Sequence, residues 1–356
     1  MAEKTLLKGN HALVEGVIYA GCRFFAGYPI TPQNEIPEYM SVRMPAAGGV
    51  FIQTESELAA INMLFGAAAT GARVMTSSSS PGISLMQEGL SYISGADIPV
   101  LVAKVVRGGP GLGNIAPSQA DYYQATRGGG HGDYFTIVLA PDSAQELFEF
   151  PKLAYSLAEK YRIPVMLLAD GLLGQMMEPV ELNYEPIDPK SIPVQDWWLT
   201  GCQGRERRVV RSYDLGPGKL EEWNWRRWNE TYVPIMKNEQ RYQALQCDDA
   251  EIVLVAYGTS ARIGGAAVRI ARDQGIKAGL IRLISLWPFP KNILAELAKK
   301  VGDMLVVEMS MGQMIDDVKL ATEGKTKVHF HGRPGGGIPT PNEVYEKIRS
   351  IAGGKK

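Results

Sequence analysis

The chain has 356 residues, which is enough for two domains that each bury a core of their own. Charged residues make up 21% of the chain, and the formal net charge of -1 gives no electrostatic reason to expect nucleic acid or an anionic membrane as a partner. The amino terminus lacks the long apolar core of a secretory signal and no apolar run reaches 18 residues, so we expect a cytoplasmic protein without membrane spans.

The first half of the chain reads as alternating strands and helices. Short, mostly apolar runs suit strands that are buried on both faces of a parallel sheet, and they predict strands at 23–26, 50–53, 73–76, 100–106, 135–139 and 165–169. Helices are predicted between them, at 8–20, 33–43, 55–70, 84–95, 118–126 and 143–160. This alternation predicts a doubly wound parallel α/β domain over residues 1–182.

The second half begins with a segment of different composition. Residues 183–248 hold five of the six tryptophans, interleaved with arginines and prolines. Such a mixture can stack on nucleic acid, but the segment also carries many acids, so we interpret it as an inter-domain connection whose aromatics pack on another domain or subunit. Residues 249–356 resume the α/β pattern, with strands predicted at 252–257, 278–284, 304–308 and 328–330 and helices at 260–273, 291–300 and 312–322. We therefore expect two doubly wound parallel-sheet domains.

Two motifs stand where predicted strands give way to helices, the place where such sheets bind ligands. The first is the turn Tyr28–Pro32, in which two prolines bracket Thr31. Local rules allow Thr31 to be an N-cap with Pro32 at the first helical position. The alternative is a rigid display of the Thr31 hydroxyl at the carboxyl edge of the sheet.

The second motif is the acidic run that follows the strand at 50–53. Thr54 with Glu57 three residues later fits a capping box, which gives Glu57 a structural explanation. Glu55 would then lie in the first helical turn, where the helix dipole favours an acid. The functional alternative for Glu55 is a carboxyl that hydrogen-bonds the aminopyrimidine ring of thiamine diphosphate, which needs an acid of shifted pKa at such a junction.

Three further stretches carry groups suited to ligands. Arg107 follows an apolar run and can fork onto a carboxylate, although a surface arginine near a loop is the simpler interpretation. Gly111–Ala116 also fits a dinucleotide fingerprint, but prolines flank it and leave no helix directly on the glycines. Ser79 and Pro81 lie in a serine-rich stretch that can offer hydroxyls to a ligand or simply cap a helix.

Two other features are less informative. His131 lies in a glycine-rich loop and is either an acid–base group or an exposed loop residue. The three cysteines are far apart in the sequence and no C-x-x-C spacing occurs. We therefore expect no metal site that needs four cysteines, and no iron–sulfur cluster, on this chain.

Several short motifs, taken in order, resemble the pyrimidine-binding, alpha-type subunit of the 2-oxoacid:ferredoxin oxidoreductases. They are Gly27–Pro32, Gln53–Ala60, Ser79–Gly82, Arg107–Gly113, Leu286–Pro290 and Val307–Met314. The resemblance spans most of the chain and is weakest over 183–248. It is closest to the 3-methyl-2-oxobutanoate (2-ketoisovalerate) type, through Arg107–Ile115 and Gly128–Tyr134, with the 2-oxoglutarate type as a near neighbour.

This resemblance implies a thiamine-diphosphate-binding pyrimidine domain followed by a transketolase C-terminal-like α/β domain. It implies that Glu55 activates the cofactor and that Thr31 and Arg107 hold the substrate. The residues that it implies for binding the cofactor are Glu55, Tyr28, Pro29, Ser79 and Pro81. The implied reaction converts a 2-oxoacid and coenzyme A into acyl-CoA, carbon dioxide and two electrons for ferredoxin.

What the sequence lacks points to partners. It contains no G-D-G followed by the Asn-Asn pair that binds magnesium and diphosphate in thiamine enzymes, and Asp170-Gly171 is not enough. We therefore expect the diphosphate and Mg²⁺ on a second subunit and iron–sulfur clusters on a partner. The resemblance implies that this partner is a ferredoxin-like subunit and that a gamma-type subunit is also present in the complex. A nicotinamide dehydrogenase using Gly111–Ala116 and a non-catalytic scaffold subunit remain as alternatives.

Overall fold

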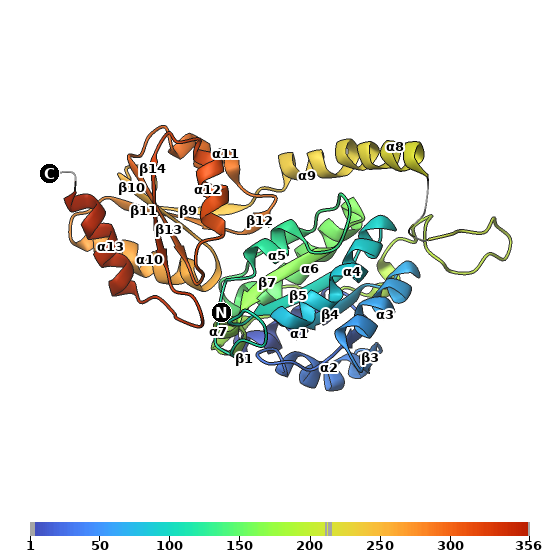
Figure 1. Cartoon of the computed structure of the whole chain (residues 1–356). Coiled ribbons are helices and arrows are strands. Elements are labelled where there is room, and N and C mark those ends of the chain that lie inside the picture. The colour runs from blue at the N-terminus through green and yellow to red at the C-terminus, as the bar shows by residue number, and fades with distance from the viewer. Residues whose placement is uncertain (1–3, 211, 213–215, 355–356) are drawn as a thin grey trace.

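The computed structural model describes residues 4–210, 212 and 216–354, which form two α/β lobes and a long connecting segment (Figure 1). In the described residues, the sheet of the N-terminal lobe has the strand order β12-β6-β7-β5-β4-β2-β3. Its strands are β2 (Phe24–Gly27), β3 (Val50–Gln53), β4 (Val74–Ser78), β5 (Leu101–Val106), β6 (Ile137–Leu139), β7 (Val165–Asp170) and β12 (Ser285–Trp287). Neighbouring strands run parallel except at β12, which pairs antiparallel with β6.

The sheet of the C-terminal lobe is smaller, with the order β14-β13-β10-β11-β9 among the described strands. These strands are β9 (Tyr242–Leu245), β10 (Ile252–Ala256), β11 (Ala278–Leu283), β13 (Asp303–Glu308) and β14 (Lys327–Gly332). Only the edge strand β9 pairs antiparallel within this described sheet. A separate antiparallel ribbon joins β1 (Lys4–Lys8) to β8 (Met177–Glu181).

Helices cover both sheets, as the doubly wound prediction requires. The N-terminal lobe has α1 (Gly9–Tyr19), α2 (Glu35–Ala46), α3 (Glu57–Ala69), α4 (Ser80–Gly95), α5 (Tyr122–Arg127), α6 (Ala144–Tyr161) and α7 (Gly171–Gln175). The C-terminal lobe has α10 (Gly258–Asp273), α11 (Lys291–Leu297), α12 (Met314–Thr322) and α13 (Pro341–Gly353). None of the helices in the described residues is long and apolar enough to cross a membrane.

Local sequence explains where several helices begin. Ser143 caps α6 by accepting the backbone N–H of Glu146, and Thr340 and Glu343 form a complete capping box at α13 with Pro341 in its first turn. The strands β5 and β7 are buried at every residue and apolar except for Lys104 and Asp170, as expected for strands in the middle of the large sheet. On one face of that sheet α1 approaches α6 closely, since a Cβ atom at Gly16 would lie 2.2 Å from the carbonyl oxygen of Phe148.

The predicted strands all overlap observed ones, but the sheets mix segments from different parts of the chain. Residues 242–245, predicted as part of the connecting segment, form β9 at the edge of the C-terminal sheet. Residues 285–287, predicted within the second domain, form β12 at the edge of the N-terminal sheet. Edge strands this short carry too little apolar pattern to be recognised locally.

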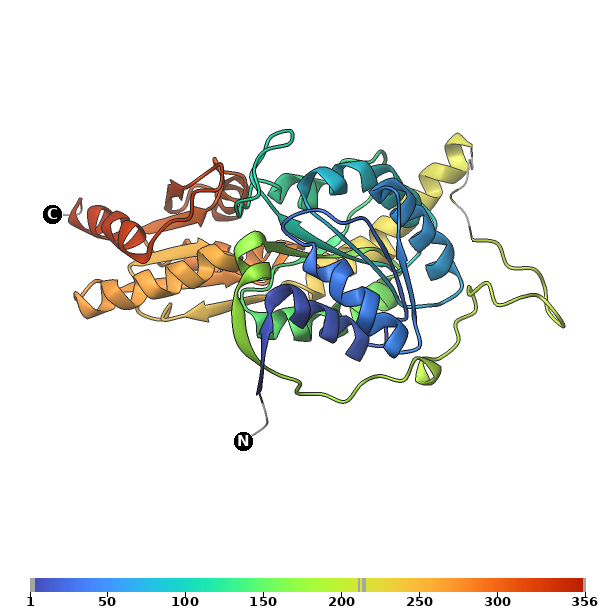
Figure 2. The same cartoon turned by 90° about the horizontal axis from the view of Figure 1, so that it is seen from below.

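The connecting segment leaves β8 and runs along the edge of the N-terminal lobe (Figure 2). It contains the short helix η1 (Pro189–Ser191) and then α8 (Pro217–Arg227), the π-helical turn η2 (Trp228–Tyr232) and α9 (Val233–Asn238), which follow one another as a rod (Figure 1). The ring of Phe135 stacks on Trp287 at 4.8 Å and meets Tyr232 edge-on at 5.1 Å. Aromatic side chains of the segment therefore pack on the lobes, as the tryptophan-rich composition predicts.

One buried amide joins the two lobes. The side-chain oxygen of Gln119 accepts the backbone N–H of Met309 at 3.0 Å and the hydroxyl of Ser260 at 2.7 Å. Its side-chain nitrogen donates to the carbonyl oxygen of Tyr257 at 2.9 Å. Gln119 is only 2% exposed, so these bonds form in a setting where an unmet polar group costs about 1–3 kcal/mol.

Candidate active site

The large sheet reverses its winding direction between β2 and β4. From β2 the chain continues to β3 on one side, then crosses back to β4 and onward to β5 on the other side. In open α/β sheets, ligands bind in the crevice at the carboxyl ends of the strands at such a switch point. The turn Tyr28–Pro32, the Thr54–Glu57 run and Ser79 all follow strands at this edge.

The turn Tyr28–Pro32 is held against the sheet by a buried amide. Gln33 is fully buried; its side-chain oxygen accepts the Ser77 hydroxyl at 2.6 Å and its nitrogen donates to the carbonyl oxygen of Tyr28 at 3.3 Å. Thr31 is partly exposed and its hydroxyl accepts from Asn34 Nδ2 at 3.1 Å. Asn34 rather than Thr31 is the N-cap of α2, so the interpretation of Thr31 as a helix cap is wrong.

The two candidate acids lie in different surroundings. Glu55 is exposed, whereas Glu57 is 4% exposed and its Oε1 accepts the hydroxyl of Ser78 at 3.2 Å. The predicted capping box between Thr54 and Glu57 is wrong, because Ser56 caps α3 and accepts the backbone N–H of Ala59. The helix begins at Glu57, two residues after the Glu55 start that a Thr54 cap implies, and Glu57 faces the interior.

The space around Glu57 depends on a glycine in the first turn of α4. A Cβ atom at Gly82 would lie 2.2 Å from Glu57 Oε1 and 2.1 Å from the hydroxyl oxygen of Ser78. Any larger residue would therefore displace the carboxylate. Pro81 lies beside this glycine in the same turn and is partly exposed.

Ser79 lies at the same edge of the sheet. It is the N-cap of α4 by backbone conformation, but its side chain makes no capping hydrogen bond. Its hydroxyl is fully buried and, among the described residues, has no hydrogen-bond partner, and the same is true of Thr76 on β4. Buried hydroxyls without partners are uncommon, so this edge has polar capacity suited to a ligand with donor and acceptor atoms. A ring with nitrogen atoms, such as an aminopyrimidine, fits these groups.

Arg107 follows β5 at the same edge of the sheet. It is 7% exposed, so the simpler interpretation of a surface arginine is wrong. Its Nη1 donates to the carbonyl oxygen of Thr31 at 3.0 Å and its Nη2 to that of Leu112 at 2.9 Å, while the backbone N–H donates to the Ser80 hydroxyl at 3.2 Å. Among the described residues no carboxylate forms an ion pair with this guanidinium, and Nε has no partner. A buried cation without an anion is costly, and a carboxylate ligand would relieve that cost.

The remaining candidates lie in a loop, at a helix cap or in the Tyr28–Pro32 turn itself. Gly111–Ala116 form a loop, and the next helix begins only at Tyr122, so the dinucleotide fingerprint lacks the helix it requires. Asp170 caps α7 by accepting the backbone N–H groups of Leu172 and Leu173, and burial raises the pKa of its carboxyl. Tyr28 is 38% exposed at the rim of the turn, and Pro29 beside it is partly exposed.

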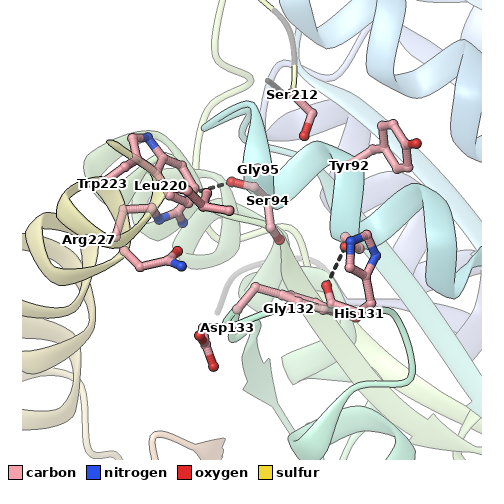
Figure 3. Close-up of a pocket in the computed structure, with 13 residues that line it drawn as sticks. Tyr92, Ser94, Gly95, His131, Gly132, Asp133, Ser212, Leu220, Trp223 and Arg227 are labelled. Atoms are coloured by element: carbon pink, nitrogen blue, oxygen red, sulfur yellow. Dashed lines mark hydrogen bonds between the residues drawn. The ribbon is translucent and has the colours of Figure 1, made fainter. Parts of the chain in front are cut away.

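A cavity of about 500 Å³ lies elsewhere, between α4, the glycine-rich loop and α8 (Figure 3). Figure 3 shows His131 on one side of it and Trp223 and Arg227 of α8 on the other. The backbone oxygen of His131 accepts the hydroxyl of Ser91 at 2.7 Å. The loop precedes β6 and thus lies at the amino edge of the sheet, opposite the carboxyl edge where Arg107 follows β5.

No group of three or more histidine, cysteine, aspartate or glutamate side chains is placed to hold a metal ion in the part of the chain that the structure describes. Sequence reasoning singled out Glu55 and missed the burial of Glu57. The available signal was Ser56, which is as good an N-cap as Thr54 and directly precedes Glu57.

The family model for pyruvate flavodoxin/ferredoxin oxidoreductase, thiamine diphosphate-binding, matches residues 15–197. The chain belongs to this family. A second model, for core domain II of pyruvate:ferredoxin oxidoreductase, matches residues 250–344. These matches confirm the predicted family and its thiamine diphosphate-binding fold.

Individual proteins give the same result. The ketoisovalerate oxidoreductase subunit VorB of Methanothermobacter marburgensis is 47% identical over 98% of each chain. The 2-oxoglutarate synthase subunit KorA of the same organism is 36% identical over 99% of this chain and 100% of its own. A solved 2-oxoglutarate:ferredoxin oxidoreductase from Magnetococcus marinus superposes with a TM-score of 0.86 at 24% identity; it covers 98% of this chain, which spans 65% of that one. This structural match supports the two-lobed α/β fold.

Proposed function

We propose that this chain is the pyrimidine-binding subunit of a thiamine diphosphate-dependent 2-oxoacid:ferredoxin oxidoreductase. The observation that carries the proposal is Arg107, a buried cation without an ion-pair partner among the described residues, which follows β5 next to the switch point and hydrogen-bonds the Thr31 carbonyl. The first turn of α4 links it to the buried acid, since Ser80 binds the backbone of Arg107 and Gly82 packs against Glu57. Family membership supports the same assignment.

The proposed reaction consumes a 2-oxoacid and the thiol of coenzyme A. It releases carbon dioxide, the thioester acyl-CoA, one proton and two electrons, which pass to ferredoxin. When bound, thiamine diphosphate supplies the acidic thiazolium carbon and the electron sink for this decarboxylation. The protein residues on this chain bind, orient and exchange protons with the reactants.

We propose a role for each candidate residue at the carboxyl edge of the sheet. We assign the carboxylate that hydrogen-bonds the pyrimidine ring to Glu57, because it is buried at the junction where Glu55 is exposed. The Glu55 assignment implied by the motif remains the alternative. Arg107 and Thr31 orient the carboxylate and carbonyl of the 2-oxoacid, and Ser79 offers its buried hydroxyl to the cofactor, with Tyr28, Pro29 and Pro81 along the rim.

The substrate that we propose is 3-methyl-2-oxobutanoate (ketoisovalerate). The support is the higher identity to the ketoisovalerate oxidoreductase subunit, 47%, against 36% for the 2-oxoglutarate synthase subunit. 2-Oxoglutarate is the alternative substrate. The two substrates differ by a second carboxylate, which is a larger chemical difference than the single methylene that allows about 10- to 200-fold discrimination.

The proposal also requires partner subunits. We assign the diphosphate and Mg²⁺ to a partner with its own thiamine diphosphate domain, and the iron–sulfur clusters to a ferredoxin-like subunit, with a gamma-type subunit completing the complex. The three free cysteines at 22, 202 and 247 are consistent with electrons leaving through a partner. A cytoplasmic location remains a prediction.

The direct test is turnover by the complex that forms around a tagged copy of this chain. Reduction of a viologen dye should require both coenzyme A and a 2-oxoacid, with kcat/KM for 3-methyl-2-oxobutanoate at least about 10-fold above that for 2-oxoglutarate. The isolated chain should be inactive. Turnover by the isolated chain, or tight NAD binding to it, would contradict the proposal and favour a dehydrogenase.

A further inference from the structure

The carbonyl oxygen of Pro32, at the end of the turn that carries Thr31, receives hydrogen bonds from two distant side chains. Asn10 Nδ2 donates to it at 3.1 Å and Gln175 Nε2 donates to it at 3.0 Å. Asn10 lies at the start of α1 and is 1% exposed, and Gln175 is the last residue of α7. Segments that are 165 positions apart in the chain therefore meet on one carbonyl group.

The same two amide groups also donate hydrogen bonds to the carboxylate of Glu35. Glu35 Oε2 accepts from Asn10 Nδ2 at 3.0 Å and from Gln175 Nε2 at 2.8 Å, and Lys8 approaches the other oxygen at 3.4 Å. Each amide group thus uses both of its hydrogens, one on Pro32 and one on Glu35. Burial acts to raise the pKa of Glu35, but hydrogen bonds from its own backbone, Gln175, Asn10 and Lys8 outweigh it and hold that pKa below its usual value.

Close packing fixes this cluster. A Cβ atom at Gly174 would lie 2.5 Å from Asn10 Oδ1, and one at Gly171 would lie 3.0 Å from the Pro32 ring. Strands β5 and β4 separate β7, which precedes α7, from β2, which precedes the turn. The turn therefore extends from β2 across the ends of β4 and β5. There it is hydrogen-bonded by Arg107, which follows β5, and by Gln175 of α7, which follows β7.

We propose that Asn10, Gln175 and Glu35 are positioning residues for the substrate, acting through the Thr31–Pro32 turn. The inference rests on the proposed function, because it assumes that Thr31 and Arg107 orient the 2-oxoacid. Arg107 holds the turn through the Thr31 carbonyl and the amide cluster holds it through the next carbonyl along the chain. Without the cluster, the turn keeps its hydrogen bonds to Arg107 and Gln33. The Thr31 hydroxyl can then move away from its position beside the bound substrate.

The test compares two matched glutamines in the assembled complex. Gln175→Met removes both donations while keeping a side chain of similar length. Gln145→Met is the control, because Gln145 Nε2 also donates to a carboxylate, Glu149 Oε1 at 2.9 Å, and to a backbone carbonyl, that of Glu181 at 2.9 Å. Gln175→Met should raise KM for the 2-oxoacid roughly 3- to 10-fold and leave KM for coenzyme A unchanged. Gln145→Met should change neither constant.

A reciprocal exchange separates positioning from stability. The double variant Gln175→Glu with Glu35→Gln keeps an amide and a carboxylate side by side, but a carboxylate at 175 has no hydrogen to donate to Pro32. We expect the melting temperature to recover toward that of the wild type while KM for the 2-oxoacid stays raised. Recovery of both together would overturn the inference.

Two other results are decisive. If Gln175→Met leaves KM for the 2-oxoacid unchanged, or changes it no more than Gln145→Met does, the positioning role is overturned and the proposed function still stands. A wild-type complex without 2-oxoacid turnover overturns the proposed function and this inference with it. Thermal unfolding of each variant complex confirms that the kinetic constants describe folded protein.

Discussion

Replacement of Glu57 by glutamine tests the assignment of the cofactor-activating acid. The change keeps the size of the side chain, and the amide oxygen can still accept the Ser78 hydroxyl that lies 3.2 Å from Oε1. In its proposed role the carboxyl would exchange a proton with the pyrimidine ring, which an amide cannot do, and such acid–base help is worth roughly 100- to 10,000-fold in rate. We therefore expect Glu57→Gln to lower kcat for 2-oxoacid oxidation by at least about 100-fold.

The cost to stability should be small by comparison. Glu57 is the first residue of α3, and removal of an acid from a helix amino terminus costs about 0.3–1 kcal/mol. Glu55→Gln is the matched control, because this acid is two residues away and exposed. Its complex should keep kcat within about threefold, the scale of a surface charge change.

The assay is 2-oxoacid- and coenzyme A-dependent reduction of a viologen dye by purified complexes, with subunit content checked by size-exclusion chromatography. If Glu55→Gln abolishes turnover while Glu57→Gln retains it, the burial argument is refuted and the exposed acid must enter the site on assembly. If both variants remain active, the subunit is a scaffold and the catalytic acid lies on another chain.

Two further predictions follow from packing and burial. Gly82→Ala should displace the Glu57 carboxylate, since the new Cβ would lie 2.2 Å from Oε1. A displacement of about 1 Å can cost about 100-fold in rate, so we expect kcat/KM to fall by about that factor. Gly66→Ala on α3 is the control and should leave kcat/KM unchanged, because nothing lies within 4 Å of a Cβ atom there. Burial raises the pKa of the Cys22 thiol to about 11, so in the folded chain at pH 8 iodoacetamide should label exposed Cys202 quickly and Cys22 only after denaturation. Labelling of Cys22 in the native state at that pH, read by mass spectrometry, would show that its burial is wrong.

Local pattern was sufficient to predict the order of the main strands and helices. The strand at 50–53 is observed at Val50–Gln53, and the run at 165–169 is observed as Val165–Asp170. These segments are buried on both faces, so their apolar composition is a direct consequence of their place in the sheet. The strand-end position of Thr31 and Arg107 follows from the same pattern.

Other features depend on contacts between distant segments. The strands β9 and β12 are short and join sheets that their sequence neighbours do not belong to. Helices α8 and α9 lie in a segment with little apolar periodicity, which gives no local signal of helix.

The sequence alone determined that this is a two-part α/β chain with polar residues at its strand ends, and its motifs identified the family. Only the tertiary structure decided which of two acids two residues apart is buried, because α3 begins at Glu57, two residues later than a Thr54 cap implies, and Glu57 packs against Ser78 and Gly82. The tertiary structure also brought Asn10 and Gln175 together on Pro32. Periodicity reports which face of an element is apolar, whereas hydrogen bonds between polar groups far apart in the chain exist only once the sheet has set its strand order.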